Sequence, residues 1–264
     1  MDDILLESQT GAVVELRLNR VAARNALSLA MIERLQMALD RLKDDASVHV
    51  IVIAAEGPVF CAGHDLKEIT QARAADDNGQ VFFETIMAAC SRMMESIVTC
   101  PKPVIASVQG VATAAGCQLV ASCDLALAST EAGFATPGVN IGLFCSTPMV
   151  ALSRNVSRKA AMEMLLTGEI VPADRACGLG LVNRVAAPKA LAKDTMELAQ
   201  KIASKSPKTL KIGKEAFYAQ AEMPLHDAYD YASRVMVTNL LDRDSREGID
   251  AFIAKRPPKW SPLD

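Results

Sequence analysis

The chain has 264 residues, of which 50% are hydrophobic and only 4% aromatic, so its core is expected to consist of Ala, Val, Leu, Ile and Met. A net charge of −3 leaves no excess of basic side chains for neutralising phosphates, which argues against a nucleic-acid-binding surface. Seven cysteines without a CxxC pair and three scattered histidines favour neither a disulfide framework nor a metal site. The first residues lack the features of a secretory signal, so a cytoplasmic protein is expected.

The first two thirds of the chain alternate between strand and helix patterns. An amphipathic helix is predicted over residues 29–42 with Ser28 as its N-cap, and a long helix lies within residues 80–99. This alternation predicts an α/β domain over residues 1–188. Short runs rich in β-branched residues predict buried strands over residues 12–18, 48–54, 104–108 and 125–128.

One apolar stretch, residues 103–123, contains no charged side chain and is long enough to cross a membrane. It also contains Pro103, Gly110 and Gly116, which interrupt a long apolar helix. We interpret this stretch as buried strands and a buried helix that follow one another closely.

From residue 189 onward the strand patterns stop. Pro207 and Pro224 separate helical segments, and the third of these segments has an apolar face that needs burial. The pattern predicts a helical subdomain over residues 189–264 that packs on the core or on a neighbouring subunit. Its four helices are expected at residues 189–204, 209–221, 225–239 and 245–255.

Two strand-to-helix turns, within residues 50–68 and 102–124, share one design. In each, a buried strand enters a loop of Gly, Ala and Cys, and a helix follows. Small residues allow another group to approach the backbone, and the start of a helix leaves N–H groups unpaired. Two such turns facing each other would offer two donors to one oxygen, as the stabilisation of a thioester enolate requires. For one turn alone, close helix–strand packing is the simpler explanation.

Five segments together resemble the crotonase (enoyl-CoA hydratase/isomerase) superfamily, and they extend over nearly the whole chain. The resemblance implies a spiral of ββα units, a C-terminal helical trimerisation subdomain, and a homotrimer or dimer of trimers. It also implies an acyl-coenzyme A substrate, with no cofactor besides the coenzyme A of that substrate. The segments are NRVAARNALS (19–28), FCAGHDLKE (60–68), KPVIASVQGVATAAGCQL (102–119), LTGEIVPADRACGLGLVNRV (166–185) and REGIDAFIAKRPPKW (246–260).

The resemblance implies an oxyanion hole made of two backbone N–H groups. One belongs to His64, which follows the glycine of CAGHD, and the other to Ala115, the middle residue of the triplet Ala114-Ala115-Gly116. An alanine in place of the family's glycine keeps the N–H group but demands an ordinary backbone conformation.

The resemblance places coenzyme A against basic side chains, because its phosphates attract cations. The matching positions are Arg24, Lys67 and Lys255, and Ala62 and Asp65 of the CAGHDL segment are implied as further contacts. A solvated surface charge is the alternative interpretation for each lysine and arginine.

A hydratase of this family uses two glutamates, one to take a proton from water and one to supply a proton to carbon. The matching positions hold Gln118 and Gly138, and residues 133–153 contain no charge. Some relatives carry an aspartate at the position of Ser146. Gln118 can hydrogen-bond and orient water, but it cannot exchange protons near neutral pH. The other side chains that could take part in chemistry are His64, Cys117, Asn140 and Cys145.

Two functions of different classes stay open on this sequence. The first is an acyl-CoA enzyme that acts mainly through the oxyanion hole, as a weak hydratase, isomerase, decarboxylase or thioesterase. The second is a non-catalytic acyl-CoA-binding protein. In either case we expect little hydration of crotonyl-CoA.

Overall fold

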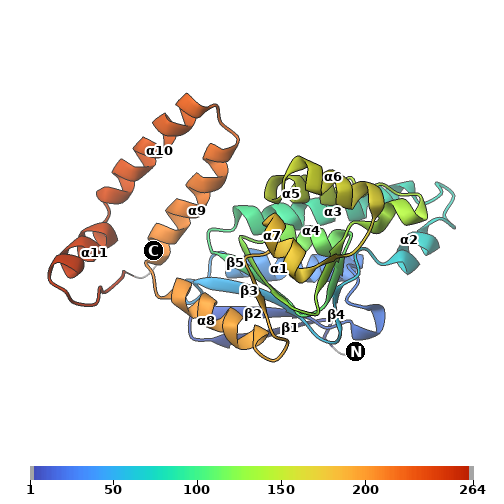
Figure 1. Ribbon diagram of the computed structural model, residues 1–264, viewed down its shortest axis with the longest axis horizontal. Coiled ribbons are helices and arrows are strands. Elements are labelled where there is room, and N and C mark those ends of the chain that lie inside the picture. The colour runs from blue at the N-terminus through green and yellow to red at the C-terminus, as the bar shows by residue number, and fades with distance from the viewer. Residues whose placement is uncertain (1–2, 262–264) are drawn as a thin grey trace.

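The computed structural model describes residues 3–261 and contains two sheets with helices on both sides (Figure 1). The larger sheet has the strand order β1-β2-β3-β5-β7-β10. β1 pairs with β2 in antiparallel fashion, and the later pairings of this sheet are parallel. Its strands are β1 (Leu5–Thr10), β2 (Val13–Leu18), β3 (Val50–Ala55), β5 (Val104–Val108), β7 (Leu125–Ser129) and β10 (Arg184–Ala186).

The smaller sheet, together with the larger one, shows the repeating ββα unit of the fold. Its order is β4-β6-β8-β9, and its first three strands are parallel. Each pair β3–β4, β5–β6 and β7–β8 sends one strand into each sheet, and a helix follows the pair. The predicted α/β class and ββα spiral are confirmed. The elements are β4 (Val59–Cys61), β6 (Val111–Thr113), β8 (Gly133–Ala135), β9 (Val171–Pro172), α2 (Leu66–Ala72), α4 (Ala115–Ser122) and the 3₁₀ helix η2 (Pro137–Ile141).

Helix α4 is central to the fold because all eight of its residues are buried. A helix with no exposed face needs no charged residue, which explains the long uncharged stretch 103–123: it contains β5, β6 and α4. Within the described residues, no helix is both long and apolar enough to cross a membrane. The interpretation of this stretch as successive buried elements is confirmed.

Helices cover both faces of the larger sheet (Figure 1). On one side the predicted helix α1 (Leu29–Leu42) begins where Met31 N donates to Ser28 Oγ at 3.2 Å, which confirms the N-cap. On the other side, Leu191 and Ala199 of α8 (Leu191–Ala203) pack with strand residues of the sheet. The other helices of the body are η1 (Val21–Ala23), α3 (Gln80–Thr99), α5 (Pro148–Asn155), α6 (Arg158–Thr167) and α7 (Ala173–Leu179).

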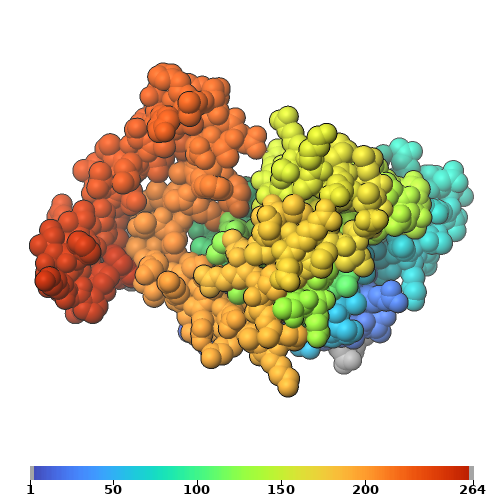
Figure 2. Space-filling view, in the orientation of Figure 1, coloured from blue at the N-terminus to red at the C-terminus, as the bar shows by residue number. Residues whose placement is uncertain are grey.

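The last three helices, α9 (Pro207–Ala221), α10 (Leu225–Leu240) and α11 (Arg243–Ile253), form an arm that projects from the body (Figures 1 and 2). Helix α9 begins two residues earlier than predicted. Ser206 Oγ accepts from Thr209 N at 3.1 Å, and Pro207 occupies the first helical position, where a missing N–H costs no hydrogen bond.

A partly buried ion pair joins the arm to the body at Asp124. Its Oδ2 atom accepts from Lys214 Nζ and from Val104 N, both at 2.7 Å, and its Oδ1 atom accepts from Tyr218 Oη at 2.9 Å. The Lys214 side chain is only 7% exposed, so this pair is shielded from solvent. Asp124 therefore joins α9 to the strand β5 and to the end of α4, a structural role.

Candidate functional site

The CAGHD turn is held by hydrogen bonds to the segment before α1. Leu27 N donates to Gly63 O at 2.8 Å, and Asp65 N donates to Leu27 O at 3.3 Å, which makes Leu27 and His64 a parallel bridge pair. In a parallel bridge of this kind, the backbone N–H and C=O groups of Leu27 bond to Gly63 and Asp65, the residues on either side of His64. The N–H group of His64 itself is therefore directed away from Leu27.

The second turn packs directly against the first. A Cβ at Gly116 would lie 2.2 Å from the carbonyl oxygen of Cys61, so only glycine fits there. A Cβ at Gly63 would lie 2.9 Å from Ala114 Cβ and 3.3 Å from Ala115 N. The backbones of the two turns are therefore in contact at Gly63 and Ala115.

Both amide groups that the motifs single out are unpaired. Ala115 is the first residue of α4, and its neighbour Ala114 donates to Ala135 O at 2.9 Å and accepts from Gln118 N at 3.0 Å. Within residues 3–261, neither His64 N nor Ala115 N donates a hydrogen bond. The two contacting turns thus provide two unpaired N–H groups.

In the triplet Ala114-Ala115-Gly116, the strained backbone conformation lies at Ala114 and not at Ala115. Ala115 lies in the helix, in line with the ordinary conformation expected for it. Ala114, however, has φ 51° and ψ −120°, a combination that favours glycine. Backbone strain of this kind typically costs about 1–3 kcal/mol and occurs most often where a functional geometry is held in place.

Asp65 has two partners within the chain. Arg20 Nη2 lies 2.9 Å from its Oδ2 atom, and its Oδ1 atom accepts from Lys67 N at 3.0 Å, which caps α2. Burial raises the pKa of Asp65, but the hydrogen bonds from Arg20 and from the Lys67 amide outweigh burial and hold this pKa below its usual range. The carboxylate thereby fixes the turn, and its expected contact with coenzyme A stays a prediction. Arg20 was not singled out from the sequence.

The structure brings two of the three predicted coenzyme A cations to the same region. Arg24 O accepts from Ala62 N at 3.1 Å, and Lys67 lies in the first turn of α2, so both residues adjoin the CAGHD turn. Both side chains are exposed and form no ion pair within the described chain. Lys255 follows α11, at the opposite end of the molecule from α2 (Figure 1). Within one chain, Lys255 therefore cannot join the other two.

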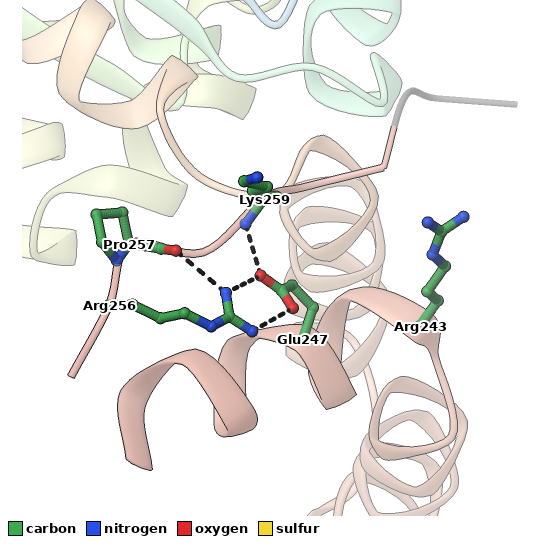
Figure 3. A pocket seen from close by; sticks show the side chains of 5 residues that line it. All are labelled: Arg243, Glu247, Arg256, Pro257 and Lys259. Atoms are coloured by element: carbon green, nitrogen blue, oxygen red, sulfur yellow. Dashed lines mark hydrogen bonds and ion pairs between the residues drawn. The ribbon is translucent and has the colours of Figure 1, made fainter. Parts of the chain in front are cut away.

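A surface pocket of about 620 Å³ lies at α11 and the residues that follow it (Figure 3). Its centre is Glu247, which accepts from Arg256 Nη1 and Nη2 at 2.6 and 2.9 Å and from Lys259 N at 2.8 Å. The hydrogen bond from Arg256 lowers the pKa of Glu247 to about 2. Glu247 and Arg256 thus pair with each other, and the Lys259 amide bonds to Glu247. We interpret the pocket as the place where the end of the chain folds back onto α11. Arg243 and Pro257 complete its lining.

Three polar side chains near the two turns lack partners. Gln118 is 5% exposed and its Oε1 atom accepts no hydrogen bond, and the same holds for Oγ1 of the fully buried Thr136. Both ring nitrogens of His64 are likewise buried and unpaired in the described structure. Burial lowers the pKa of His64, so its ring is neutral at physiological pH. Thr136 was missed from the sequence; its one distinguishing feature was a polar residue inside an uncharged segment.

Gly138 has no room for a side chain. A Cβ there would lie 2.6 Å from Leu143 O and 2.9 Å from Cys145 Sγ, although Gly138 does not have a positive φ. The restriction at Gly138 is therefore steric and does not come from its backbone conformation. Ser146 is exposed, and burial raises the pKa of Cys145, which keeps the thiol protonated. Among residues 3–261, no group of His, Cys, Asp and Glu side chains could hold a metal ion.

The Enoyl-CoA hydratase/isomerase family model matches residues 8–262, and the chain belongs to this family. The mouse protein Enoyl-CoA hydratase domain-containing protein 3, mitochondrial, from Mus musculus, is 49% identical over 253 residues, which are 96% of this chain and 83% of that protein. The Homo sapiens protein of the same name is also 49% identical and is covered over 82% of its length. The identification made from the sequence motifs is confirmed.

Solved structures agree with this assignment. The crystal structure of an enoyl-CoA hydratase from Mycobacterium smegmatis is 51% identical with a TM-score of 0.93, covering 98% of this chain and 99% of that one. The structure of human enoyl Coenzyme A hydratase domain-containing protein 3 is 46% identical, also with a TM-score of 0.93, covering 98% of this chain and all of that one. The crotonase fold is thereby confirmed.

The prediction of a cytoplasmic protein is wrong by the same comparison. The mouse, human and rat relatives, at 48–49% identity, are all named as mitochondrial proteins. The absence of a secretory signal, on which the prediction was based, says nothing about transport into mitochondria.

We expect Gly138→Ala to lower the free energy of unfolding by about 2 kcal/mol, because the added methyl group overlaps a carbonyl oxygen that cannot move alone. Gly178→Ala is the matched control. Gly178 lies in α7 with no atom within 4 Å of its Cβ position, so this change should raise stability by about 0.5–1 kcal/mol. Urea unfolding of both variants measures the difference, and equal stabilities would contradict the steric explanation.

Proposed function

We propose that the chain binds an acyl-coenzyme A thioester and places its carbonyl oxygen between the amides of His64 and Ala115. The observation that supports this most directly is the contact of the two turns with both N–H groups unpaired. Two fixed donors at one oxygen stabilise the negative charge of an enolate or a tetrahedral intermediate. One such donor is typically worth about 3 kcal/mol in the transition state.

Coenzyme A would lie over the start of α2. Arg24 and Lys67 are exposed cations beside the CAGHD turn, and both could bind phosphate oxygens, while Ala62 and Asp65 shape the same surface. Lys255 could take part only from a second chain, because the arm carries it away from α2 (Figure 1). This arrangement favours an oligomer in which the arm of one protomer approaches the site of another.

The chemistry that fits this site is an altered or weak form of the family reaction. Gln118 cannot transfer protons near neutral pH, and the steric restriction at Gly138 leaves no place for a second carboxylate. Reactions that need an enolate stabilised but no strong base, such as decarboxylation, remain compatible with two backbone donors. A non-catalytic acyl-CoA-binding protein is the alternative, and thioester hydrolysis is a further one.

Ala115→Pro tests the oxyanion hole. Proline removes the N–H group and suits the first position of a helix, but Ala115 is buried and Ala114 before it is strained, so circular dichroism must first confirm that the variant folds. Because one hydrogen bond to the thioester oxygen is lost, calorimetry with butyryl-CoA should show binding weakened by about tenfold. Arg158→Pro, at the first position of α6, is the control and should leave binding unchanged. Failure of the unmodified protein to bind any acyl-CoA would overturn the proposed function.

Crotonyl-CoA hydration separates altered chemistry from the ordinary family reaction. We expect the unmodified protein to hydrate this substrate slowly, as followed by the loss of absorbance of the conjugated thioester. Gln118→Glu should raise the rate, since one positioned acid or base is worth at least about a hundredfold. Gln118→Met should not raise it. Fast hydration by the unmodified protein would show that another group replaces the glutamates, and no turnover of any acyl-CoA would favour the binding protein.

The apolar face of α10 predicts self-association, and the family resemblance implies a trimer or a dimer of trimers. Leu225, Tyr229, Met236 and Leu240 lie on one side of this helix and are 52–75% exposed in the single chain. Light scattering should report an oligomer at micromolar concentration. Met236→Lys combined with Leu240→Lys should give smaller species, whereas Thr238→Lys on the other side should not. A stable monomer of the unmodified protein would exclude this assembly.

A further inference from the structure

One guanidinium group joins the two chain segments that form the bridge between Leu27 and His64. Arg20 Nη1 donates to Ala26 O at 2.8 Å, and Arg20 Nη2 donates to Asp65 Oδ2 at 2.9 Å. Ala26 directly precedes Leu27 in the first segment, and Asp65 directly follows His64 in the second. The rigid, planar fork of the arginine therefore connects both sides of the bridge, and the compact ammonium group of a lysine does not reproduce this fork.

The backbone from which this side chain extends is itself held in place by Asn25. Arg20 N donates to Asn25 Oδ1 at 2.8 Å, and Arg20 O accepts from Asn25 N at 3.0 Å. Asn25 is buried, and its Nδ2 atom donates to Glu56 O and to Val59 O, both at 2.8 Å. The side-chain amide of Asn25 thus uses its oxygen and both of its hydrogens, and it ties Arg20 to the connection between β3 and β4.

The bridge determines where the unpaired N–H group of His64 points. Leu27 N donates to Gly63 O at 2.8 Å and Leu27 O accepts from Asp65 N at 3.3 Å, so the residues on both sides of His64 are fixed. A hydrogen bond weakens steeply once its distance and angle leave a narrow range. The amide of His64 is therefore an effective donor only while the two segments keep this register. Because the carboxylate of Asp65 neutralises the guanidinium, Arg20 acts on this geometry and adds no free charge.

We infer that Arg20 is a positioning residue for the oxyanion hole, whose fork keeps the His64 amide directed at the thioester oxygen. This inference rests on the proposed function, because it takes that oxygen to lie between the amides of His64 and Ala115. Arg20 acts through the turn and not on the ligand. A purely structural role would weaken the binding of every ligand of the site to the same extent. A positioning role weakens only the contact with the carbonyl oxygen, and this difference can be measured.

A pair of ligands that differ only in the carbonyl oxygen tests the inference. Butyryl-CoA has this oxygen, and S-butyl-coenzyme A is the thioether with the same chain and no oxygen. Calorimetry on the unmodified protein should show the thioester binding more tightly. Arg20→Met should weaken the thioester about tenfold and the thioether less than about twofold. In infrared difference spectra, the carbonyl stretch of butyryl-CoA labelled with carbon-13 should fall in frequency on binding, and this shift should be smaller in the variant at saturation.

Arg17→Met is the matched control, because Arg17 pairs with two carboxylates outside the bridge, Glu15 at 2.5 Å and Glu56 at 3.3 Å. It should keep both the preference for the thioester and the carbonyl shift. If Arg20→Met does not fold, Arg20→Lys keeps the cation without the fork and should lose about threefold of the preference.

The possible outcomes separate this inference from the proposed function. An unchanged preference and carbonyl shift in the Arg20 variant, or equal weakening of the thioester and the thioether, would overturn the inference and leave the proposed function standing. An unmodified protein that binds neither ligand, or that binds butyryl-CoA without a carbonyl shift, would overturn both.

Discussion

The contact between the two small-residue turns is the constraint on which the rest of the structure depends. Gly116 sits where a single methyl group would lie 2.2 Å from the carbonyl oxygen of Cys61, and a methyl group at Gly63 would lie 2.9 Å from Ala114 Cβ and 3.3 Å from Ala115 N. Close approach of two backbones requires glycine at both points. The buried helix α4 then has to begin at Ala115, with its first N–H groups facing the other turn. Ala114 adopts a strained conformation to make this entry.

On one side of this contact, helix α4 and residues 133–153 carry no charged side chain. Gly138 is enclosed by backbone and sulfur atoms, and burial favours the neutral forms of the His64 ring and the Cys145 thiol. A low dielectric strengthens backbone dipoles and penalises isolated charges at the same time. These surroundings are consistent with the proposed role of the site, in which backbone N–H groups stabilise charge that develops on a bound ligand.

Helix α4 extends from the candidate site to the point where the arm joins the body. The helix begins at the contact of the turns and ends next to Asp124, whose carboxylate holds Lys214 and Tyr218 of α9. That ion pair, in which the Lys214 side chain is only 7% exposed, is one contact that holds α9 against the body. Figure 2 shows the arm as a separate projection. Its apolar residues are exposed in the single chain, as is typical of a surface that binds another protein.

The sequence alone determined the α/β class, the helical C-terminal region, the family and the two turns, because these depend on local patterns and on motifs of adjacent residues. The prediction that Gln118 and Gly138 stand in place of the glutamates also came from the sequence motifs. Short strands such as β4 and β8 were not predicted, since three residues carry too little periodicity. Only the tertiary structure placed Lys255 away from Lys67, enclosed Gly138, and left buried side-chain atoms of His64, Gln118 and Thr136 without a partner. Those relations join residues far apart in the chain, and no local pattern records which backbone atoms fill the space beside a given side chain.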